Sequence, residues 1–185
     1  MMSPETAWVG LGSNLSDPAA QISRALVALD GLPLTGVTQY SSLYRTAPIG
    51  DVDQPDFVNA VCQVHTELSP VRLLAALLEL ERLFGRQRDE RRFGPRVLDI
   101  DLLLYGEKRL DELGLTIPHP RLHERRFVLE PLAELAPELD IPGRGPVRVL
   151  LAACLGQAVQ RIGPPQLDTV AGAVRDAVPG AAHQT

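Results

Sequence analysis

The spacing of hydrophobic residues along the chain predicts an alternation of strands and helices. Short runs that are apolar or alternate with polar residues indicate strands at residues 7–11, 37–44, 57–67 and 97–105. Apolar residues at helical spacing follow Asp17 and Ser69, each a capping residue directly before a proline, which is typical of a helix start. Two further helices are expected at residues 126–135 and 147–155.

The order of these elements predicts the fold class. A β-α-β-β-α-β order with C-terminal additions matches the α+β, ferredoxin-like plan, in which helices pack on an antiparallel sheet. We expect a single domain over residues 1–163 and a flexible tail over residues 164–185, where the sequence is small, polar or rich in proline and glycine. The connections 45–56 and 85–96 are longer than this scaffold needs, and such loops are usually functional or mobile.

The composition narrows the class of protein. The chain has 185 residues, of which 45% are hydrophobic and 22% charged, so a disordered or low-complexity protein is excluded. We expect neither a membrane span, which needs about 20 apolar residues in a row, nor a signal peptide. The chain has only 2 cysteines, too few for a disulfide framework, which favours a reducing cytoplasm.

Charge is distributed unevenly along the chain. The net charge of -5 argues against a general nucleic-acid binder. Residues 82–127 nevertheless carry a local positive excess, supplied by arginines and a single lysine, Lys108. Compositional bias in the genome would explain the number of arginines but not their clustering. Because a guanidinium group suits bidentate contact with phosphate oxygens, the cluster predicts an anion site.

Two acids in one predicted strand give the sharpest local signal. Asp99 and Asp101 occur in the sequence LDIDL, and the alternation of side chains along a strand places both on one face. Two ionised carboxylates this close repel each other unless a cation lies between them, and their oxygens suit Mg²⁺. The opposite face is expected to point into the core with Leu98, Ile100, Leu102 and Leu104. The alternative is a pair of solvated acids, which the adjoining arginines disfavour.

The loop before this strand is rich in arginine. Arg86, Arg88 and Arg96 bracket the loop beside the two acids. Cations next to a metal-binding carboxylate pair are consistent with a polyphosphate that bridges them. For Arg91 and Arg92, which adjoin acidic residues, a solvated charge run is the better interpretation.

Three weaker signals lie elsewhere in the chain. Phe57 and Asn59 share a strand face, and a ring beside an amide suits a planar heterocycle, although a core aromatic with a polar neighbour is an equal alternative. His119 lies between two prolines, and a lone histidine is more often structural than catalytic. The segment 10–14 lacks the Gly-Lys-Ser/Thr of a P-loop and is interpreted as a tight strand-to-helix turn.

Four ordered blocks of the sequence resemble the 6-hydroxymethyl-7,8-dihydropterin pyrophosphokinase family. They are GLGSNL, then SSLYRTAPIG with DQPDFVNAV, then GRQR with FGPRVLDIDLLLY, and finally LTIPHPRLHERRFVLEPLAELAP. The resemblance extends from about Val9 to Pro137 and implies a ferredoxin-like enzyme of folate biosynthesis. It implies transfer of diphosphate from ATP to the hydroxymethyl group of the pterin, with release of AMP.

The resemblance also implies roles for individual residues. Two Mg²⁺ ions would be held by Asp99 and Asp101. The arginines that assist catalysis would be Arg86, Arg88 and Arg96. The ATP site would consist of Arg88, Arg96, Leu102, Thr116, His119 and Arg125. The pterin site would consist of Thr46, Pro48, Phe57, Asn59, Phe93 and Phe127.

Two positions depart from the family pattern. Phe93 stands where the family often has tryptophan, so an aromatic ring is kept but the indole N–H is lost. Gly114 stands where relatives place a basic phosphate contact, so that contact is missing here.

Two alternative functions remain open from the residues alone. A Mg²⁺-dependent nucleotidyltransferase would use the same paired acids but attack the α-phosphorus and release pyrophosphate. A ferredoxin-like RNA-binding module would use arginines for phosphate and phenylalanines for stacking, against which the acidic net charge argues. We expect a cytoplasmic monomer whose partners are ATP and the reduced pterin, without nucleic acid or membrane.

Replacement of Arg88 by alanine is expected to slow the reaction more than it weakens pterin binding. Arginines that contact the transition state in related phosphoryl transfers contribute about 10³- to 10⁵-fold in rate. Single-turnover rates and pterin dissociation constants of the variant test this, and equal losses in both would instead indicate a structural arginine.

Overall fold

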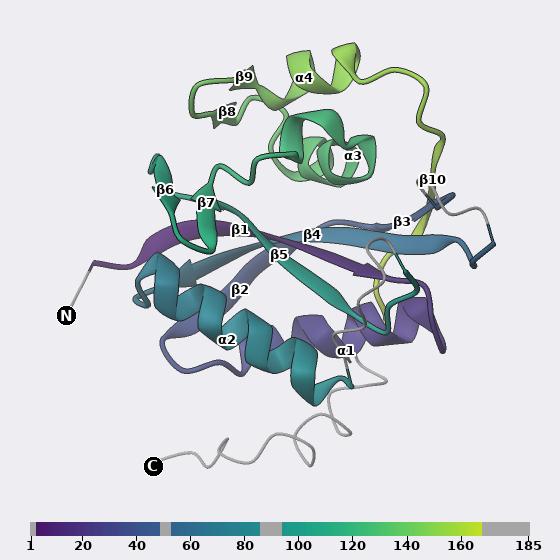
Figure 1. Cartoon of the computed structure of the whole chain (residues 1–185), viewed down its shortest axis with the longest axis horizontal. Helices are drawn as coiled ribbons and strands as arrows, with labels where there is room; N and C mark the ends of the chain where they lie inside the picture. Colours follow the sequence, from purple (N-terminus) through teal and green to yellow (C-terminus); the bar gives the residue numbers. More distant parts are fainter. Residues whose placement is uncertain (1–2, 49–52, 86–93, 168–185) are drawn as a thin grey trace.

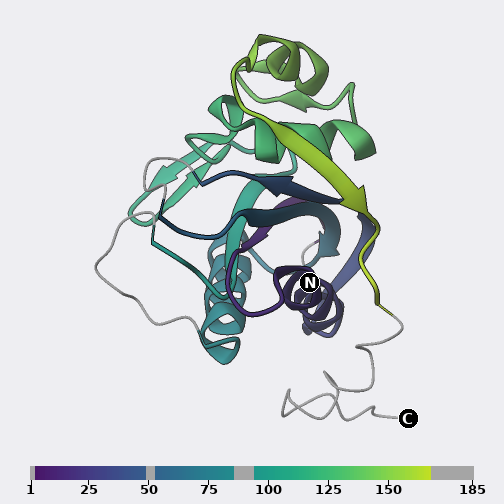
Figure 2. The same ribbon diagram turned by 90° about the vertical axis from the view of Figure 1, so that its right-hand side faces the viewer.

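The computed structural model describes residues 3–48, 53–85 and 94–167, which form an antiparallel sheet with helices on both faces (Figures 1 and 2). The main sheet contains β1 (Glu5–Ser13), β2 (Thr35–Tyr40), β3 (Leu43–Thr46), β4 (Phe57–Thr66), β5 (Asp99–Tyr105) and β10 (Val159–Gly163). One face is covered by α1 (Pro18–Asp30) and α2 (Pro70–Leu83), and the other by α3 (Arg126–Leu135), against which α4 (Val147–Ala153) packs. This architecture confirms the expected combination of an antiparallel sheet with packed helices.

Strand β1 lies between β4 and β5 in the main sheet. Along the sheet the order is β10-β3-β4-β1-β5, and β2 also pairs with β4. Strand β1 pairs with β4 over its whole length and with β5 on its other side. Residues of β4 and β5 that are far apart in sequence are therefore brought to either side of the same β1 residue.

The starts of the two long helices follow the predicted capping pattern. The Asp17 side chain accepts a hydrogen bond from the backbone N–H of Ala20 (3.2 Å), and Pro18 opens α1. The Ser69 hydroxyl accepts from the N–H of Arg72 (3.4 Å), and Pro70 opens α2. Local sequence signals thus define where both helices begin.

Two hydrophobic layers lie on opposite faces of the sheet. The first joins α1 and α2 to one face and includes Cys62, and the second joins α3 to the other face and includes Cys154. Both cysteines are free and buried, which agrees with the expectation that no disulfide framework exists. Burial raises the pKa of the Cys62 thiol to about 12.

The predicted strand 37–44 is divided into β2 and β3 at a pair of serines. The N–H of Val61 donates to the Ser41 hydroxyl (3.0 Å) instead of to a strand carbonyl, and the Ser41 hydroxyl donates to the carbonyl of Ser42 (2.7 Å). Serine side chains therefore replace part of the backbone ladder, which interrupts the strand at this point.

The prediction for Leu104 was wrong. Leu98, Ile100 and Leu102 lie in the first layer as expected, but Leu104 lies in the second layer with Trp8. The pairing with β1 shifts between Trp8 and Val9, which face Leu104 and Leu102 respectively. Leu103 is therefore an additional residue in β5 that forms a β-bulge. The bulge reverses the alternation of side chains beyond it.

Several short elements were not predicted. They are β6 (Leu110–Glu112), β7 (Leu115–Ile117), the 3-10 helix η1 (Leu122–Glu124), β8 (Asp140–Ile141), β9 (Gly145–Pro146) and β10. After β10, the N–H of Gln166 donates to the Ser23 hydroxyl (3.1 Å), and Leu167 packs on the first layer. The remaining residues of the predicted tail, 168–185, lie outside the described residues, and the domain boundaries stay a prediction. Across the described ranges, no helix combines the length and hydrophobicity that a membrane span needs.

A carboxylate on α3 ties two strands to this helix. Glu134 accepts hydrogen bonds from the backbone N–H (3.0 Å) and the hydroxyl (2.8 Å) of Ser42 and from the hydroxyl of Tyr44 (2.7 Å). It also pairs with Arg161 on β10 (3.2 Å). Burial alone would raise the pKa of Glu134, but the hydrogen bonds from Tyr44 and Ser42 and the charge of Arg161 outweigh it and lower the pKa.

The lowered pKa of Glu134 predicts a stability that depends on pH. Because the folded-state pKa lies below the ordinary value of 4.5, the stabilisation is present above that value and is lost as the pH falls through the folded-state pKa. Glu134→Gln should therefore be less stable than the wild type at about pH 7, by roughly 1–2 kcal/mol, with the gap closing towards about pH 3. Melting temperatures across this range test the prediction.

A matched control for this measurement is Glu138→Gln. Glu138 pairs with Arg148, but its side chain is 71% exposed, and such exposed pairs contribute little. A gap for Glu134→Gln that does not change with pH, or equals that of the control, would contradict the prediction.

Candidate active site

A pocket lies among β1, the adjoining ends of β3 and β4, the first half of β5 and the segment that enters α3. Its polar and charged lining includes Thr46, Asn59, Arg96, Asp99, Asp101 and Arg125, and its aromatic lining consists of Phe57 and Phe127. Residues predicted separately for metal, phosphate and pterin binding are therefore brought together in one pocket.

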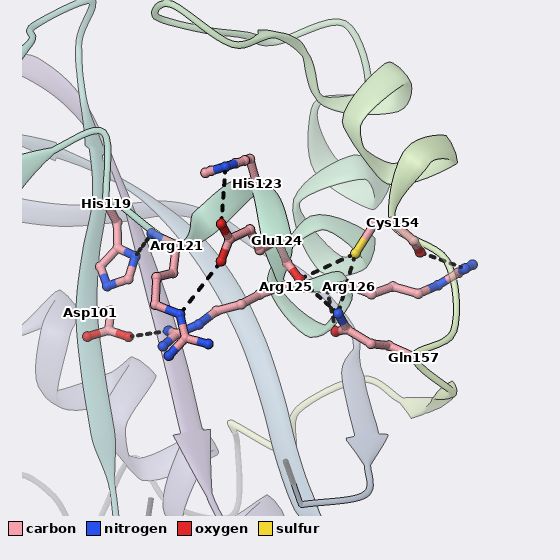
Figure 3. A network of polar contacts seen from close by, with 9 residues as sticks. All are labelled: Asp101, His119, Arg121, His123, Glu124, Arg125, Arg126, Cys154 and Gln157. Carbon is pink, nitrogen blue, oxygen red and sulfur yellow. Dashed lines mark hydrogen bonds and ion pairs between the residues drawn. The ribbon is translucent and has the colours of Figure 1, made fainter. Parts of the chain in front are cut away.

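The two acids share one face of β5, as predicted. Both line the pocket, and each is paired with an arginine. Arg96 Nη1 lies 2.6 Å from Asp99 Oδ2, and Arg125 Nη1 lies 3.5 Å from Asp101 Oδ2; Figure 3 shows Arg125 directed at Asp101. Burial and the charge of Asp99 raise the pKa of Asp101. The pair is thus an electrostatically costly arrangement that positive charge stabilises.

The floor of the pocket is the part of β1 that contains the two glycines Gly10 and Gly12. Gly12 pairs with Asn59 on one side and with Asp99 on the other. A Cβ on Gly12 would lie 3.2 Å from Asn59 Oδ1, and a Cβ on Gly10 would lie 3.4 Å from the Leu103 side chain. The turn predicted at residues 10–14 begins later, because the strand continues to Ser13. Glycine is needed here for close approach, and not only for a turn.

The aromatic end of the pocket is built from three elements. Phe57 on β4 and Phe127 on α3 both line it, as does Asn59, which is buried. The Asn59 amide donates to the Thr46 hydroxyl on β3 (2.9 Å). This bond fixes the amide so that its oxygen lies on the side of Gly12. Pro48 was predicted to line the pocket. It is half-buried, and its neighbour Ala47 lines the pocket instead.

Thr116 and His119 lie together in a neighbouring groove, with Arg109 and Arg144. Thr116 donates to Asp111 (3.2 Å), and the backbone N–H of His119 donates to the carbonyl of Leu103 (2.8 Å). Burial lowers the pKa of His119, and the nearby charge of Asp101 partly opposes this. His119 therefore connects this groove to the acid pair.

Four other residues were predicted for the site, and one of them, Leu102, is among the described residues. The Leu102 side chain is buried in the first hydrophobic layer, so only its backbone is open to a ligand role. Arg86, Arg88 and Phe93 lie outside the described residues.

Asn14 was missed by sequence reasoning and links two loops of the site. Its side-chain oxygen accepts from the N–H of Arg96 (2.7 Å), and its backbone N–H donates to the carbonyl of Arg96 (3.0 Å). Its amide nitrogen donates to Gln54 Oε1 (3.0 Å) and to the carbonyl of Pro55 (3.1 Å). Asn14 thereby positions Arg96 and the loop before β4 at once. Its sequence signals were its place in the GLGSNL block and in the predicted turn at residues 10–14, neither of which indicated its partners.

Arg121 and Gln54 were also missed, and both line the pocket. Arg121 lies four residues before Arg125 in the arginine-rich segment, where only the second arginine was singled out. The described lining of the pocket therefore includes an arginine that was not predicted.

The acidic donors in the described lining of the pocket are the two carboxylates of Asp99 and Asp101. Among the described residues, no group of three or more His, Cys, Asp or Glu side chains is placed to hold a metal ion. Asp99 and Asp101 are a hard oxygen pair and fit Mg²⁺, which often keeps few protein ligands and takes the others from water and phosphate. The donor set therefore fits an ion that arrives with a phosphate ligand.

Solved structures with a similar fold belong to larger proteins. The chain superposes on wild-type Plasmodium falciparum HPPK-DHPS with pteroate at a TM-score of 0.66 and 17% identity, covering 83% of this chain and 43% of that one. A crystal structure of HPPK-DHPS with substrates gives a TM-score of 0.68 at 13% identity, covering 82% and 43%. The chain spans less than half of either solved chain, and the likeness concerns the fold.

The sequence comparisons define the family. A family model described as 7,8-dihydro-6-hydroxymethylpterin-pyrophosphokinase (HPPK) matches residues 8–137. The 2-amino-4-hydroxy-6-hydroxymethyldihydropteridine pyrophosphokinase of Pseudomonas aeruginosa is 46% identical over 158 residues, covering 85% of this chain and 97% of the relative. That of Haemophilus influenzae is 47% identical over 137 residues, covering 74% and 85%. The chain belongs to the 7,8-dihydro-6-hydroxymethylpterin pyrophosphokinase family, as its sequence motifs predicted.

Replacement of Asn14 by leucine should both destabilise the protein and slow catalysis. The substitution removes the acceptor for the N–H of Arg96 and the donor to Gln54 Oε1 and the Pro55 carbonyl, at a cost of about 1–3 kcal/mol. Urea unfolding and steady-state kinetics measure the two effects.

The variant Asn14→Asp is the matched control for this prediction. It keeps the oxygen that accepts from Arg96 and loses the amide donor to Gln54 and Pro55, so its rate should fall less than that of Asn14→Leu. A stable and fully active Asn14→Leu variant would refute the positioning role.

Proposed function

We propose that the protein transfers diphosphate from ATP to the hydroxymethyl group of 6-hydroxymethyl-7,8-dihydropterin in this pocket, and that it releases AMP, as a step of folate biosynthesis. The observation that carries this proposal is the joint lining of one pocket by paired acids, arginines and two phenylalanines. The names of the relatives that are 39–47% identical support the same activity.

The acid pair is the proposed site of two Mg²⁺ ions. Asp99 and Asp101 would hold the ions, and the remaining ligands would be phosphate oxygens and water, since the two carboxylates form only part of a coordination shell. Bound there, the metal would neutralise charge on the phosphate oxygens. The raised pKa of Asp101, caused by burial and by Asp99, supports a preference for a cation at this place.

Arg96 and Arg125 are proposed to bind the phosphates of ATP. Each guanidinium has five N–H donors, so it can keep its contact with Asp99 or Asp101 and still contact a phosphate oxygen. Such fixed positive charge stabilises the transition state without reorganisation during the reaction. Arg86 and Arg88 are proposed to add to this charge from the preceding loop.

The transfer itself is proposed to occur by in-line substitution at the β-phosphorus. The hydroxymethyl oxygen forms a bond to that phosphorus, and the bond to the oxygen that bridges to the α-phosphate breaks. The bridging oxygen leaves on AMP, and the hydroxyl proton passes to water. Catalysis would therefore depend on position and charge, as in other phosphoryl transfers, and we assign no obligatory general base.

The aromatic end of the pocket is proposed to bind the pterin. Phe57 and Phe127 would stack on its two faces, with Phe93 closing the site. Because the Asn59 amide nitrogen donates to Thr46, the Asn59 oxygen would accept from an N–H on the pterin edge. Pro48, beside the lining residue Ala47, would complete the rim.

The adenosine part of ATP is proposed to lie between the pocket and the groove of Thr116 and His119, with a backbone contact at Leu102. His119 lies close enough to Asp101 for their charges to interact, which supports a nucleotide position that continues from the phosphates.

We further propose a ferredoxin-like core with C-terminal additions, and a cytoplasmic monomer that does not bind nucleic acid.

The product released from ATP tests the reaction. The protein is incubated with ATP, Mg²⁺ and the reduced hydroxymethylpterin, and the nucleotide products are separated. AMP together with pterin diphosphate is expected, whereas pyrophosphate would indicate attack at the α-phosphorus and a nucleotidyltransferase.

Replacement of Asp99 by alanine should abolish turnover and leave the fold intact. The substitution removes one metal-binding carboxylate from a partly exposed position at the start of β5. Activity titrated with Mg²⁺ and the circular dichroism melting curve measure the two properties. Activity close to that of the wild type, with normal Mg²⁺ dependence, would disprove the metal assignment.

A further inference from the structure

The first turn of α3 is held by a residue from the C-terminal part of the chain. Arg125, which precedes the helix, makes no side-chain capping bond within the described part of the protein. Instead, Gln157 Oε1 accepts from the backbone N–H of Arg126 (2.9 Å), and Gln157 Nε2 donates to the carbonyl of Glu124 (2.8 Å). Both bonds are drawn in Figure 3.

These two hydrogen bonds bracket Arg125. The bond to the Glu124 carbonyl lies before Arg125 in the chain, and the bond from the Arg126 N–H lies after it. The single side-chain amide of Gln157 therefore fixes the backbone on both sides of Arg125. The direction of the Arg125 side chain towards Asp101 depends on that backbone. Phe127, two residues further on, lines the same pocket, and the Arg125 guanidinium lies 5.6 Å from the centre of its ring.

The neighbouring arginine is directed away from the pocket. Arg126 Nε lies 2.9 Å from Glu130, and its Nη1 donates to the carbonyl of Cys154 (3.5 Å). Figure 3 shows Arg125 and Arg126 pointing in opposite directions from adjacent positions. The orientation of this backbone therefore determines that Arg125, and not Arg126, faces Asp101.

The segment that supplies Gln157 is anchored on both sides of this residue. Cys154 is buried in the second hydrophobic layer, and residues after Gln157 continue into β10, which pairs with β3. Residues 154–157 also lie beyond the stretch 8–137 that the family model matches. The contact therefore joins the stretch that the family model matches to a segment outside it.

We propose that Gln157 is a positioning residue, which holds Arg125 towards Asp101 and Phe127 in the aromatic wall and so sets the efficiency of diphosphate transfer. The proposal rests on the proposed function. Gln157 itself touches neither substrate, because it reaches the site only through the backbone of Glu124 and Arg126. Displacement of a catalytic group by about 1 Å can cost on the order of 10²-fold in rate.

The test substitutes Gln157→Met, which keeps the length of the side chain and removes both hydrogen bonds to the backbone of Glu124 and Arg126, together with the contact of Gln157 Nε2 with Cys154 Sγ (3.6 Å). We expect kcat/KM for ATP and for the pterin to fall about tenfold or more, with a moderate decrease in Tm. The matched control is Arg161→Ala, which removes contacts of the same C-terminal segment with Ser42 and Glu134 at the other end of α3. This control should lower Tm and leave kcat/KM within about twofold.

A double-substitution cycle with Arg125→Ala separates positioning from general stability. If Gln157 acts through Arg125, Gln157→Met should lower kcat/KM for ATP by no more than about twofold in the Arg125→Ala background. Losses that simply multiply, or equal activity losses in Gln157→Met and Arg161→Ala, would overturn the proposal.

A second variant keeps the test decisive if Gln157→Met does not fold. Gln157→Glu retains the acceptor for the N–H of Arg126 and loses the donor to Glu124, so it should fold and show a smaller loss; unchanged kcat/KM in it would overturn the proposal. A wild-type protein that releases no AMP would refute the proposed function. A wild type that turns over normally, with a Gln157→Met variant equal to it, would refute the positioning role alone.

Discussion

The pairing of Gly12 with two neighbouring strands is the constraint on which the site depends. Asn59 on β4 lies on one side of this residue and Asp99 on β5 on the other. A hydrogen-bonding amide and a carboxylate are therefore separated only by β1, which has no side chain at Gly12. A shift of one residue in either pairing would turn Asn59 or Asp99 to the opposite face. The geometry of the pocket is therefore set by backbone pairing, and the side chains inherit their positions from it.

Around this floor, charges of both signs are arranged so that each acid has an arginine. Arg96 reaches Asp99 from the loop before β5, and Arg125 reaches Asp101 from the start of α3. These arginines come from different segments and are oriented by different polar contacts, Asn14 for Arg96 and Gln157 for the backbone of Arg125. Two independent supports thus maintain the charge balance of one small region.

Much of the fold and part of the site follow from local sequence patterns. The helix starts at Asp17 and Ser69 and the shared face of the two acids depend on spacing and capping within a few residues, and these predictions were confirmed. The position of Leu104 depends on a bulge against β1, which no alternation within β5 reveals. The partners of Asn14 are 40 and 82 residues away, and those of Gln157 are 31 and 33 residues away. Such contacts depend on which loops meet in space, so the residues that orient the site were harder to predict than those that line it.

The bare floor of the pocket also limits how its selectivity can change. Even a methyl group on Gly12 would lie 3.2 Å from the Asn59 oxygen, so substitution there would displace the amide before it created any new contact. A change in the heterocycle that the proposed pterin site accepts would consequently have to proceed through the surrounding walls, such as Phe57, Phe127 and Thr46, while the strand beneath them stays unchanged.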